Sequence, residues 1–172
     1  KKDKLKVLAE LTKLRQICCD PRLHYEDYKA GSAKLDTCME LVHGALDGGH
    51  RILLFSQFTG MLDIIGKRLA KEDIAFLKLT GASSKESRAK MVAQFQAGEV
   101  PVFLISLKAG GVGLNLTAAD VVIHYDPWWN VAAQDQATDR AHRIGQQHTV
   151  TVYKLIAKDT IEERIMQMQE SK

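Results

Sequence analysis

Short apolar runs alternate with helical stretches along most of this chain, and this alternation limits the possible folds more than any other feature. The runs that fit β-strands are Ile52–Phe55, Phe76–Leu79, Val102–Ser106, Val121–Tyr125 and Val150–Ile156. The stretches with helical periodicity between and after them are Met61–Lys71, Lys85–Gln96, Val131–Ile144 and Ile161–Gln169. Strands that alternate with helices are typical of an open parallel sheet flanked by helices, so we predict an α/β fold with about five or more strands.

Two more helices are predicted before the first strand. Leucines at three-to-four spacing indicate a helix over Asp3–Cys19, and the proline that follows ends it. The stretch Pro21–Gly31 has the composition of a connector. A second amphipathic helix is predicted over Ala33–Leu46, with Ser32 as its N-cap and Gly48-Gly49 closing it.

Two helix starts carry the pattern of a capping box. Ser83 is followed three residues later by Glu86, and Thr160 is followed by Glu163. In such a box each side chain accepts a hydrogen bond from a free amide of the first helical turn. We therefore predict that Ser83 and Thr160 are N-caps.

Composition indicates one domain that is not embedded in a membrane. With 172 residues and 45% hydrophobic content the chain can bury a single core, and no apolar run approaches the roughly 20 residues of a membrane span. Cys18, Cys19 and Cys38 form no C-x-x-C pair and the histidines lack ligand spacing, so we predict core thiols in a reducing compartment and no metal site. A net charge of +3 permits nucleic-acid binding without arguing for it.

The most informative stretch is the predicted helix that begins at Val131. Gln136, Arg140 and Arg143 stand at i, i+4 and i+7, so an amide and two guanidinium groups share one helical stripe. The planar fork of arginine matches phosphate oxygens and suits the charge that develops on a transferring phosphoryl group. The alternative is a solvated face with ion pairs among Asp135, Asp139 and Arg143, and the helix taken alone favours that alternative.

Two loops beside this helix also carry unusual residues. Three glycines lie within Gly110–Gly113, directly after a predicted strand, where backbone amides can approach a phosphate closely. The loop is not G-x-G-x-x-G, and a tight turn without a ligand is the alternative. Trp128 and Trp129 follow the next strand; core packing is the usual role of such residues, but one of them can instead stack against nucleic acid.

These pieces occur together in one known family. The segment LISLKAGGVGLNLTAADVVIHYDPWWN and, shortly after it, DQATDRAHRIGQ closely resemble motifs V and VI of the SWI/SNF family of helicase-like ATPases. RILLFSQFTGMLDII resembles motif IV, and LKLTGASSKESR resembles the segment that follows it. LRQICCDP resembles the link from a preceding lobe, and TIEERI resembles the helix that closes the motor. The resemblance covers nearly the whole chain.

The resemblance implies the second, C-terminal RecA-like lobe of a motor that binds ATP between two lobes and moves along duplex DNA. The positions that match residues facing the ATP phosphates are Arg140 and Arg143, with Gln136 as their positioning partner. The positions that match the nucleotide-sensing turn are Gly111, Gly113 and Asn115. The positions that match DNA contacts are Lys108 and Trp129, and those on loops expected to face the DNA backbone are Ser56, Gln57 and Thr80.

The sequence lacks the other half of such a site. Gly66-Lys67 is followed by Arg68, and Met61 stands where a P-loop needs its first glycine, so no Walker A motif is present; no D-E-x-H box is present either. We therefore expect ATP and Mg²⁺ to be held mainly by the N-terminal RecA-like lobe of the same protein, and the isolated chain not to bind ATP tightly or hydrolyse it.

The expected organisation and partners follow from the same resemblance. Residues 1–30 are predicted to be a linking helix and connector, and residues 31–172 the lobe itself. Duplex DNA and the N-terminal lobe are the expected partners, with no membrane contact and a monomeric fragment. The expected location is intracellular: cytoplasmic, at the nucleoid, in a bacterium, and nuclear in a eukaryote.

Parts of the sequence also fit two other classes of function. A non-catalytic α/β interaction domain would use the glycine loop structurally and the arginine helix as a protein-binding face. A dinucleotide-binding oxidoreductase is opposed by the absence of the third glycine and of a strand, glycine loop and helix at the start of the sheet.

Overall fold

The computed structural model describes residues 1–107, 114–128, 130–139, 141 and 148–171. The helices are α1 (Lys2–Cys19), the short 3₁₀ helix η1 (Pro21–Leu23), α2 (Ala33–Asp47), α3 (Thr59–Lys71), α4 (Lys85–Gln96), α5 (Val131–Asp139) and α6 (Ile161–Glu170). The strands are β1 (Ile52–Ser56), β2 (Phe76–Leu79), β3 (Val102–Ser106), β4 (Val121–His124) and β5 (Thr151–Lys154). The predicted order of strands and helices is confirmed. Most predicted bounds match and most others differ by one or two residues; the exception is α5, which ends at Asp139 where the predicted helix continues to Ile144.

All strand pairs of the sheet are parallel, and the spatial order is β2-β3-β1-β4-β5. The three central strands are buried on both faces, which explains why their sequences are continuous apolar runs rather than alternating ones. β5 lies at one edge, and its residues are exposed. The predicted α/β fold with a parallel five-stranded sheet is therefore confirmed.

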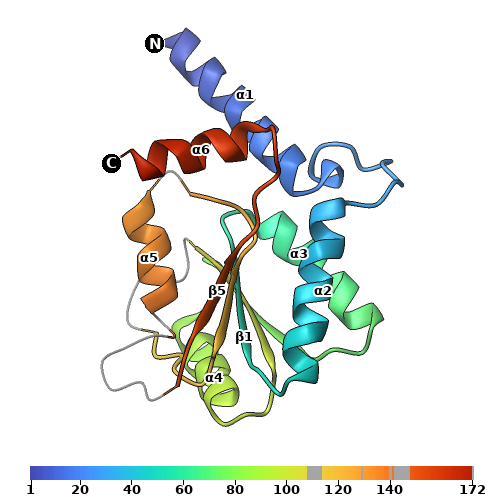
Figure 1. Cartoon of the computed structure of the whole chain (residues 1–172), viewed down its shortest axis with the longest axis vertical. Helices are drawn as coiled ribbons and strands as arrows, with labels where there is room; N and C mark the ends of the chain where they lie inside the picture. The colour runs from blue at the N-terminus through green and yellow to red at the C-terminus, as the bar shows by residue number, and fades with distance from the viewer. Residues whose placement is uncertain (108–113, 129, 140, 142–147, 172) are drawn as a thin grey trace.

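Helices cover both faces of the sheet (Figure 1), and each face has its own cluster of buried apolar side chains. Leu54 and Ile123 point to the face covered by α2 and α3. Their sequence neighbours Leu53 and Val122 point to the other face, where Phe95 of α4 and residues of α5 pack. Because side chains alternate along a strand, each central strand contributes to both cores.

The helix caps follow the sequence patterns with one correction. Ser32 caps α2 as predicted, since its hydroxyl accepts a hydrogen bond from the Leu35 amide. Thr160 caps α6 as predicted, although its hydroxyl accepts from the Glu162 amide. The prediction for α4 is wrong by one residue, because Ser84 is its N-cap.

The reason for this shift lies in the turn before α4. The hydroxyl of Ser83 accepts a hydrogen bond from the Thr80 amide at 3.1 Å, so it closes the turn after β2 instead of capping the helix. Ser83 and Ser84 could each cap the helix, but the hydroxyl of Ser83 is used in the turn, so Ser84 caps the helix. A sequence pattern alone does not distinguish them.

α1 differs from the other helices because most of it projects from the body of the molecule (Figure 1). Its apolar residues Leu5, Leu8 and Leu14 are about half or more exposed, whereas Arg15 and Cys19, near its end, are buried. The predicted helix is confirmed, but its apolar stripe is largely without cover in this chain. Within the part of the chain that the structure describes, no helix is long and apolar enough to cross a membrane.

Candidate nucleotide and nucleic-acid interface

The loops that hold the predicted site residues all follow the carboxyl ends of strands, and these ends lie together along one edge of the sheet because the strands are parallel. Ser56 and Ser106 end β1 and β3 in register with each other. Thr80 follows β2, and Asp126 lies two residues beyond the end of β4. The ends of α1 and α6 border the same edge (Figure 1).

Much of the predicted site lies outside the described residues. The predicted site residues that lie outside the described part of the chain are Arg140, Arg143, Gly111, Gly113, Lys108 and Trp129. Their roles stay predictions from the sequence. The predicted helix beyond α5 is described only at Ala141, which lies in a turn.

Asn115 and Gln136, the described members of the predicted nucleotide set, are both exposed. Their side chains are therefore accessible from solvent, and their roles stay predictions from the sequence. The neighbouring Gln134 is different: it is 1% exposed, and its side-chain oxygen accepts a hydrogen bond from the Trp128 amide at 3.2 Å. The buried glutamine of α5 therefore holds the loop before the helix, a role that the sequence pattern did not single out.

The position of Ser56 does not fit its predicted role as a DNA contact. It is fully buried, its hydroxyl donates to Asp126 Oδ1 at 2.5 Å, and the same hydroxyl accepts from the Phe58 amide at 3.1 Å. The hydroxyl is buried and already acts as both donor and acceptor within the protein, so it is not accessible to DNA. Ser56 supports the carboxylate of Asp126 in this structure.

Gln57 and Thr80 remain at the surface of this edge, each partly buried. The Gln57 amide points to Asp126 Oδ2 at 3.4 Å, at the long end of hydrogen-bond range. The Thr80 hydroxyl accepts from the Ala82 amide at 3.3 Å, within the turn that precedes α4. Both positions stay predictions as DNA contacts.

A buried polar cluster behind this edge was not predicted from the sequence. Lys34 of α2 donates to the carboxylate of Glu162 in α6 and to the Tyr125 carbonyl at 2.8 Å. The side chains of Lys34 and Glu162 are 7% and 1% exposed, so this ion pair is almost completely removed from water. Arg15 of α1, also buried, donates to the Pro127 carbonyl at 3.5 Å.

Burial dominates the electrostatics of this cluster. Burial raises the pKa of the Asp126 carboxyl above its ordinary value, against hydrogen bonding from Ser56 and the charge of Lys34. Burial likewise raises the pKa of Glu162, opposed mainly by Lys34. Burial lowers the pKa of Arg15, although nearby Asp126 works in the opposite direction. Each charged group here depends on its neighbours, as expected in a low-dielectric interior.

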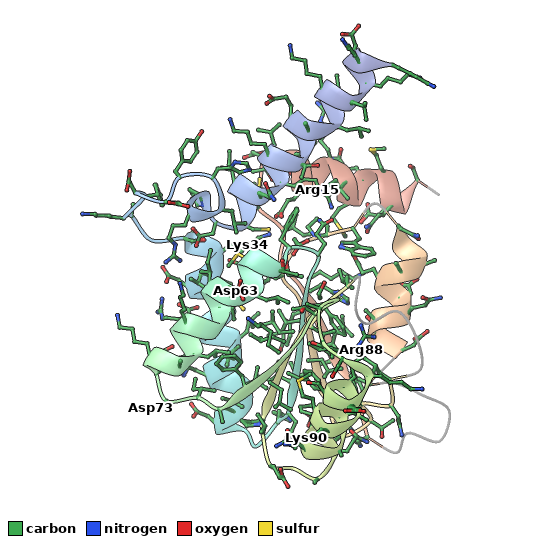
Figure 2. The ribbon with its side chains drawn as sticks, turned by 180° about the vertical axis from the view of Figure 1, so that it is seen from behind. Arg15, Lys34, Asp63, Asp73, Arg88 and Lys90 are labelled. Carbon is green, nitrogen blue, oxygen red and sulfur yellow. The ribbon has the colours of Figure 1, made fainter. Side chains whose placement is uncertain are left out.

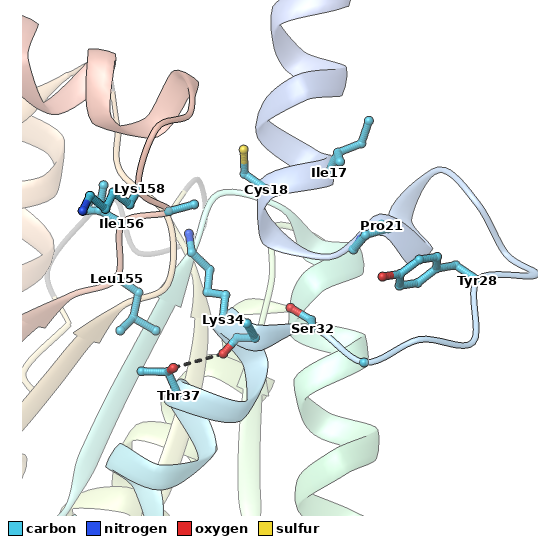
Figure 3. A pocket seen from close by; sticks show the side chains of 13 residues that line it. Ile17, Cys18, Pro21, Tyr28, Ser32, Lys34, Thr37, Leu155, Ile156 and Lys158 are labelled. Atoms are coloured by element: carbon cyan, nitrogen blue, oxygen red, sulfur yellow. Dashed lines mark hydrogen bonds between the residues drawn. The ribbon is translucent and has the colours of Figure 1, made fainter.

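A pocket of about 580 Å³ opens next to this cluster (Figure 3). It lies between the end of α1, the start of α2 and the segment after β5, and its lining includes Cys18, Lys34, Leu155 and Lys158. Figure 3 shows Lys34 reaching from α2 toward the segment that contains Ile156 and Lys158. From behind, Figure 2 places Arg15 and Lys34 at the same end of the molecule, far from Lys90 of α4.

The described residues contain no group of three or more His, Cys, Asp and Glu side chains that could hold a metal ion. Cys18, Cys19 and Cys38 are free thiols, and Cys19 and Cys38 are fully buried. Burial raises the pKa of Cys38 to about 12. These buried thiols behave as core residues, as the sequence predicted, and are protonated at neutral pH.

His124 is a buried histidine at the end of β4. Its ring stacks on Phe55 with centroids 5.5 Å apart, and Nε2 lies 3.0 Å from the Thr138 hydroxyl. Burial, helped by the charge of Lys154, lowers the pKa of His124 from 6.5 to about 4. The folded protein therefore keeps this ring neutral in a pH range where an exposed histidine takes up a proton.

This difference predicts a loss of stability in mild acid. As pH falls from about 6.5 to about 4, the unfolded chain binds a proton at His124 and the folded chain does not. The free energy of unfolding should therefore fall by about 3 kcal/mol from this group over that window. Urea unfolding at a series of pH values checks this, with His124→Gln expected to flatten the slope and His43→Asn, at an exposed histidine, expected to keep it. Equal slopes in the wild type and His124→Gln would contradict the assignment.

Comparison with known proteins shows similarity along the whole chain. Residues 33–145 match the family described as the helicase conserved C-terminal domain. An uncharacterized ATP-dependent helicase of Mycoplasma pneumoniae is 44% identical over 99% of this chain, and a chromatin-remodelling ATPase INO80 of Cryptococcus neoformans is 48% identical over 82% of it. The chain spans 17% and 8% of the lengths of these relatives.

A solved structure matches the fold over almost the same extent. It is a Sulfolobus solfataricus SWI2/SNF2 ATPase core in complex with double-stranded DNA, which is 40% identical, with a TM-score of 0.85. The match covers 99% of this chain and 36% of that one. The similarity therefore includes α1 and α6 as well as the sheet.

Proposed function

Because this chain belongs to the helicase conserved C-terminal domain family and is a C-terminal lobe of the SWI2/SNF2 type, we propose that it works as the second half of an ATP-driven motor on duplex DNA. The observation that carries the proposal is the match of the whole chain to an ATPase core bound to double-stranded DNA. The small share of its relatives that the chain spans supports the view that it acts within a longer protein.

In this proposal the chain supplies charge to a site shared between lobes. Arg140 and Arg143 reach the phosphates of ATP across the cleft, and Gln136 positions them. Gly111, Gly113 and Asn115 form the turn that responds to the nucleotide. Two arginine forks suit this role because they stabilise the charge on a transferring phosphoryl group without taking part in covalent chemistry.

In this proposal the 172 residues contain no P-loop to bind the phosphates of ATP. Gly66, the glycine nearest to a P-loop pattern, lies inside α3 and packs against the ring of Phe76, where an added Cβ would come within 3.0 Å. ATP and Mg²⁺ would be bound mainly by the N-terminal lobe. The isolated chain is therefore proposed to be inactive as an ATPase.

DNA binding by the chain should depend strongly on salt. A surface that neutralises about three phosphates loses roughly 40-fold in affinity for a fourfold rise in salt concentration. We expect this behaviour with duplexes of unrelated sequence, because backbone contacts carry little sequence information. Fluorescence anisotropy with a labelled duplex at low and moderate salt measures it.

Two variants sharpen this experiment. Lys108→Gln should reduce the slope of log affinity against log salt by about one. Lys78→Gln is the matched control, since Lys78 is already paired with Asp63 at the exposed surface. No salt-sensitive binding at any concentration tested would favour the alternative of a non-catalytic interaction domain.

A further inference from the structure

The loop Tyr125–Trp128, which follows β4, is held at consecutive residues by side chains from different elements. At Tyr125 the carbonyl accepts from Lys34 of α2 at 2.8 Å, and the phenol donates to the Cys19 carbonyl of α1 at 2.9 Å. At Asp126 the carboxylate accepts from the Ser56 hydroxyl at the end of β1. The first half of the loop is thus tied to α1, α2 and β1.

The second half of the loop is tied to three helices, α1, α5 and α6. The Pro127 carbonyl accepts from Arg15 of α1 at 3.5 Å. The Trp128 carbonyl accepts from the side chain of Gln169 in α6, and the Trp128 amide donates to Gln134 of α5. Every residue of Tyr125–Trp128 therefore has at least one contact to an element distant in the sequence.

The ion pair of Lys34 and Glu162 connects these contacts to each other. Glu162 lies in the first turn of α6 and also accepts from the Ala157 amide at 2.8 Å through the same oxygen that binds Lys34. Lys34 contacts both the Tyr125 carbonyl and the Glu162 carboxylate of α6. If α6 shifts relative to the sheet, either the contact between Lys34 and Glu162 breaks, or Lys34 moves with α6 and its hydrogen bond to the Tyr125 carbonyl changes.

We propose that Arg15, Lys34 and Gln169 are positioning residues that couple the placement of α1 and α6 to the placement of the loop Tyr125–Trp128, and so set the strength of the grip on DNA. This inference rests on the proposed function, since it assumes that the segment after β4 approaches DNA. The three residues act through the backbone carbonyls of the loop and need not touch DNA themselves.

Tryptophan fluorescence tests the hold on the loop without any activity assay. The sequence contains two tryptophans, Trp128 and Trp129, so the emission of the 172-residue chain reports this segment alone. The double variant Lys34→Met with Glu162→Leu exchanges a buried ion pair for apolar side chains, a change that many folds tolerate. We expect its emission to shift to longer wavelength and its quenching by acrylamide to increase, as in Arg15→Met.

Controls separate a released loop from an unfolded chain. Lys78→Met removes an exposed ion pair with Asp63 and should leave the emission unchanged. Arg15→Lys keeps a donor for the Pro127 carbonyl and should restore part of the wild-type emission. Cooperative unfolding of each variant identifies those that fold, and the double variant keeps the test valid if Arg15→Met does not fold. Emission like the wild type in every folded variant overturns the proposal.

The grip on DNA is tested in the full-length protein. The concentration of duplex that gives half-maximal stimulation of ATP hydrolysis should rise about tenfold in the double variant, the size expected for losing a hydrogen bond to a charged group. The KM for ATP should be unchanged, which a general loss of folding would not produce. Unchanged DNA dependence in a variant with altered emission also overturns the proposal. A different result would contradict the proposed function itself: normal ATP hydrolysis by the full-length variants Arg140→Ala and Arg143→Ala.

Discussion

In the full-length protein, Arg140→Ala and Arg143→Ala are each expected to lower the turnover of ATP by roughly 10³- to 10⁵-fold. The reason is that a guanidinium group stabilises charge that exists mainly in the transition state, so its loss affects the chemical step more than binding. ATP binding should be largely retained, because the phosphates are proposed to sit on the other lobe. Steady-state hydrolysis at saturating DNA, together with the Kd of a fluorescent nucleotide, measures both quantities.

An exposed arginine elsewhere in the lobe provides the control for this experiment. Arg68 of α3 is 38% exposed and pairs with Asp36 and Glu72. Arg68→Ala removes a positive charge and these surface contacts, which contribute at most about 1 kcal/mol. It should leave turnover near that of the wild type. Near-normal turnover in both Arg140→Ala and Arg143→Ala would show that neither residue acts on the phosphates.

The architecture was predictable because the sequence signals for it are local. A central parallel strand such as Ile52–Ser56 is buried on both faces and therefore appears as a continuous apolar run. A helix such as α2 begins after a serine, Ser32, whose hydroxyl accepts a hydrogen bond from the Leu35 amide in the first turn. Where two candidates were adjacent, as at Ser83 and Ser84, the pattern was not sufficient, because the preceding turn decides between them.

The placement of α1 shows a different limit. Its three-to-four spacing of leucines predicted the helix correctly but not the partner of its apolar stripe, which is mostly exposed. Periodicity reports that one face of a helix is apolar, not what covers that face. The same holds for Gln136 and Gln134 on α5: the spacing drew attention to Gln136, and burial selects Gln134 as the residue that holds Trp128.

The polar cluster behind the site gave almost no sequence signal. Lys34 and Glu162 lie 128 residues apart, each in the first turn of an amphipathic helix, where a charged residue is usually solvated. Asp126 was the exception that a sequence argument could have found, since a carboxylate directly after a buried strand and before a proline lies at the edge where ligands collect. Its burial against Ser56 turns both residues into supports for the loop.

Lys34→Met is expected to destabilise the chain by about 3–5 kcal/mol at neutral pH, because it leaves the carboxylate of Glu162 buried without its counter-charge. The pKa of Glu162 is already raised by burial, and Lys34 is the main influence that lowers it. Without Lys34 that pKa rises further, so the folded variant takes up a proton more readily than the unfolded chain. The extra loss should therefore be full above the folded pKa of Glu162 and shrink as pH falls below it.

Urea unfolding of the variants at neutral and mildly acidic pH tests this argument directly. Lys78→Met is the matched control, since its pair with Asp63 is about half exposed and should contribute no more than about 1 kcal/mol. Adding Glu162→Leu to Lys34→Met should recover most of the lost stability, because it removes the unpaired charge. A single variant as stable as the control would mean that the pair has access to water. A double variant as unstable as the single one would mean that Lys34 stabilises the fold chiefly through the Tyr125 carbonyl.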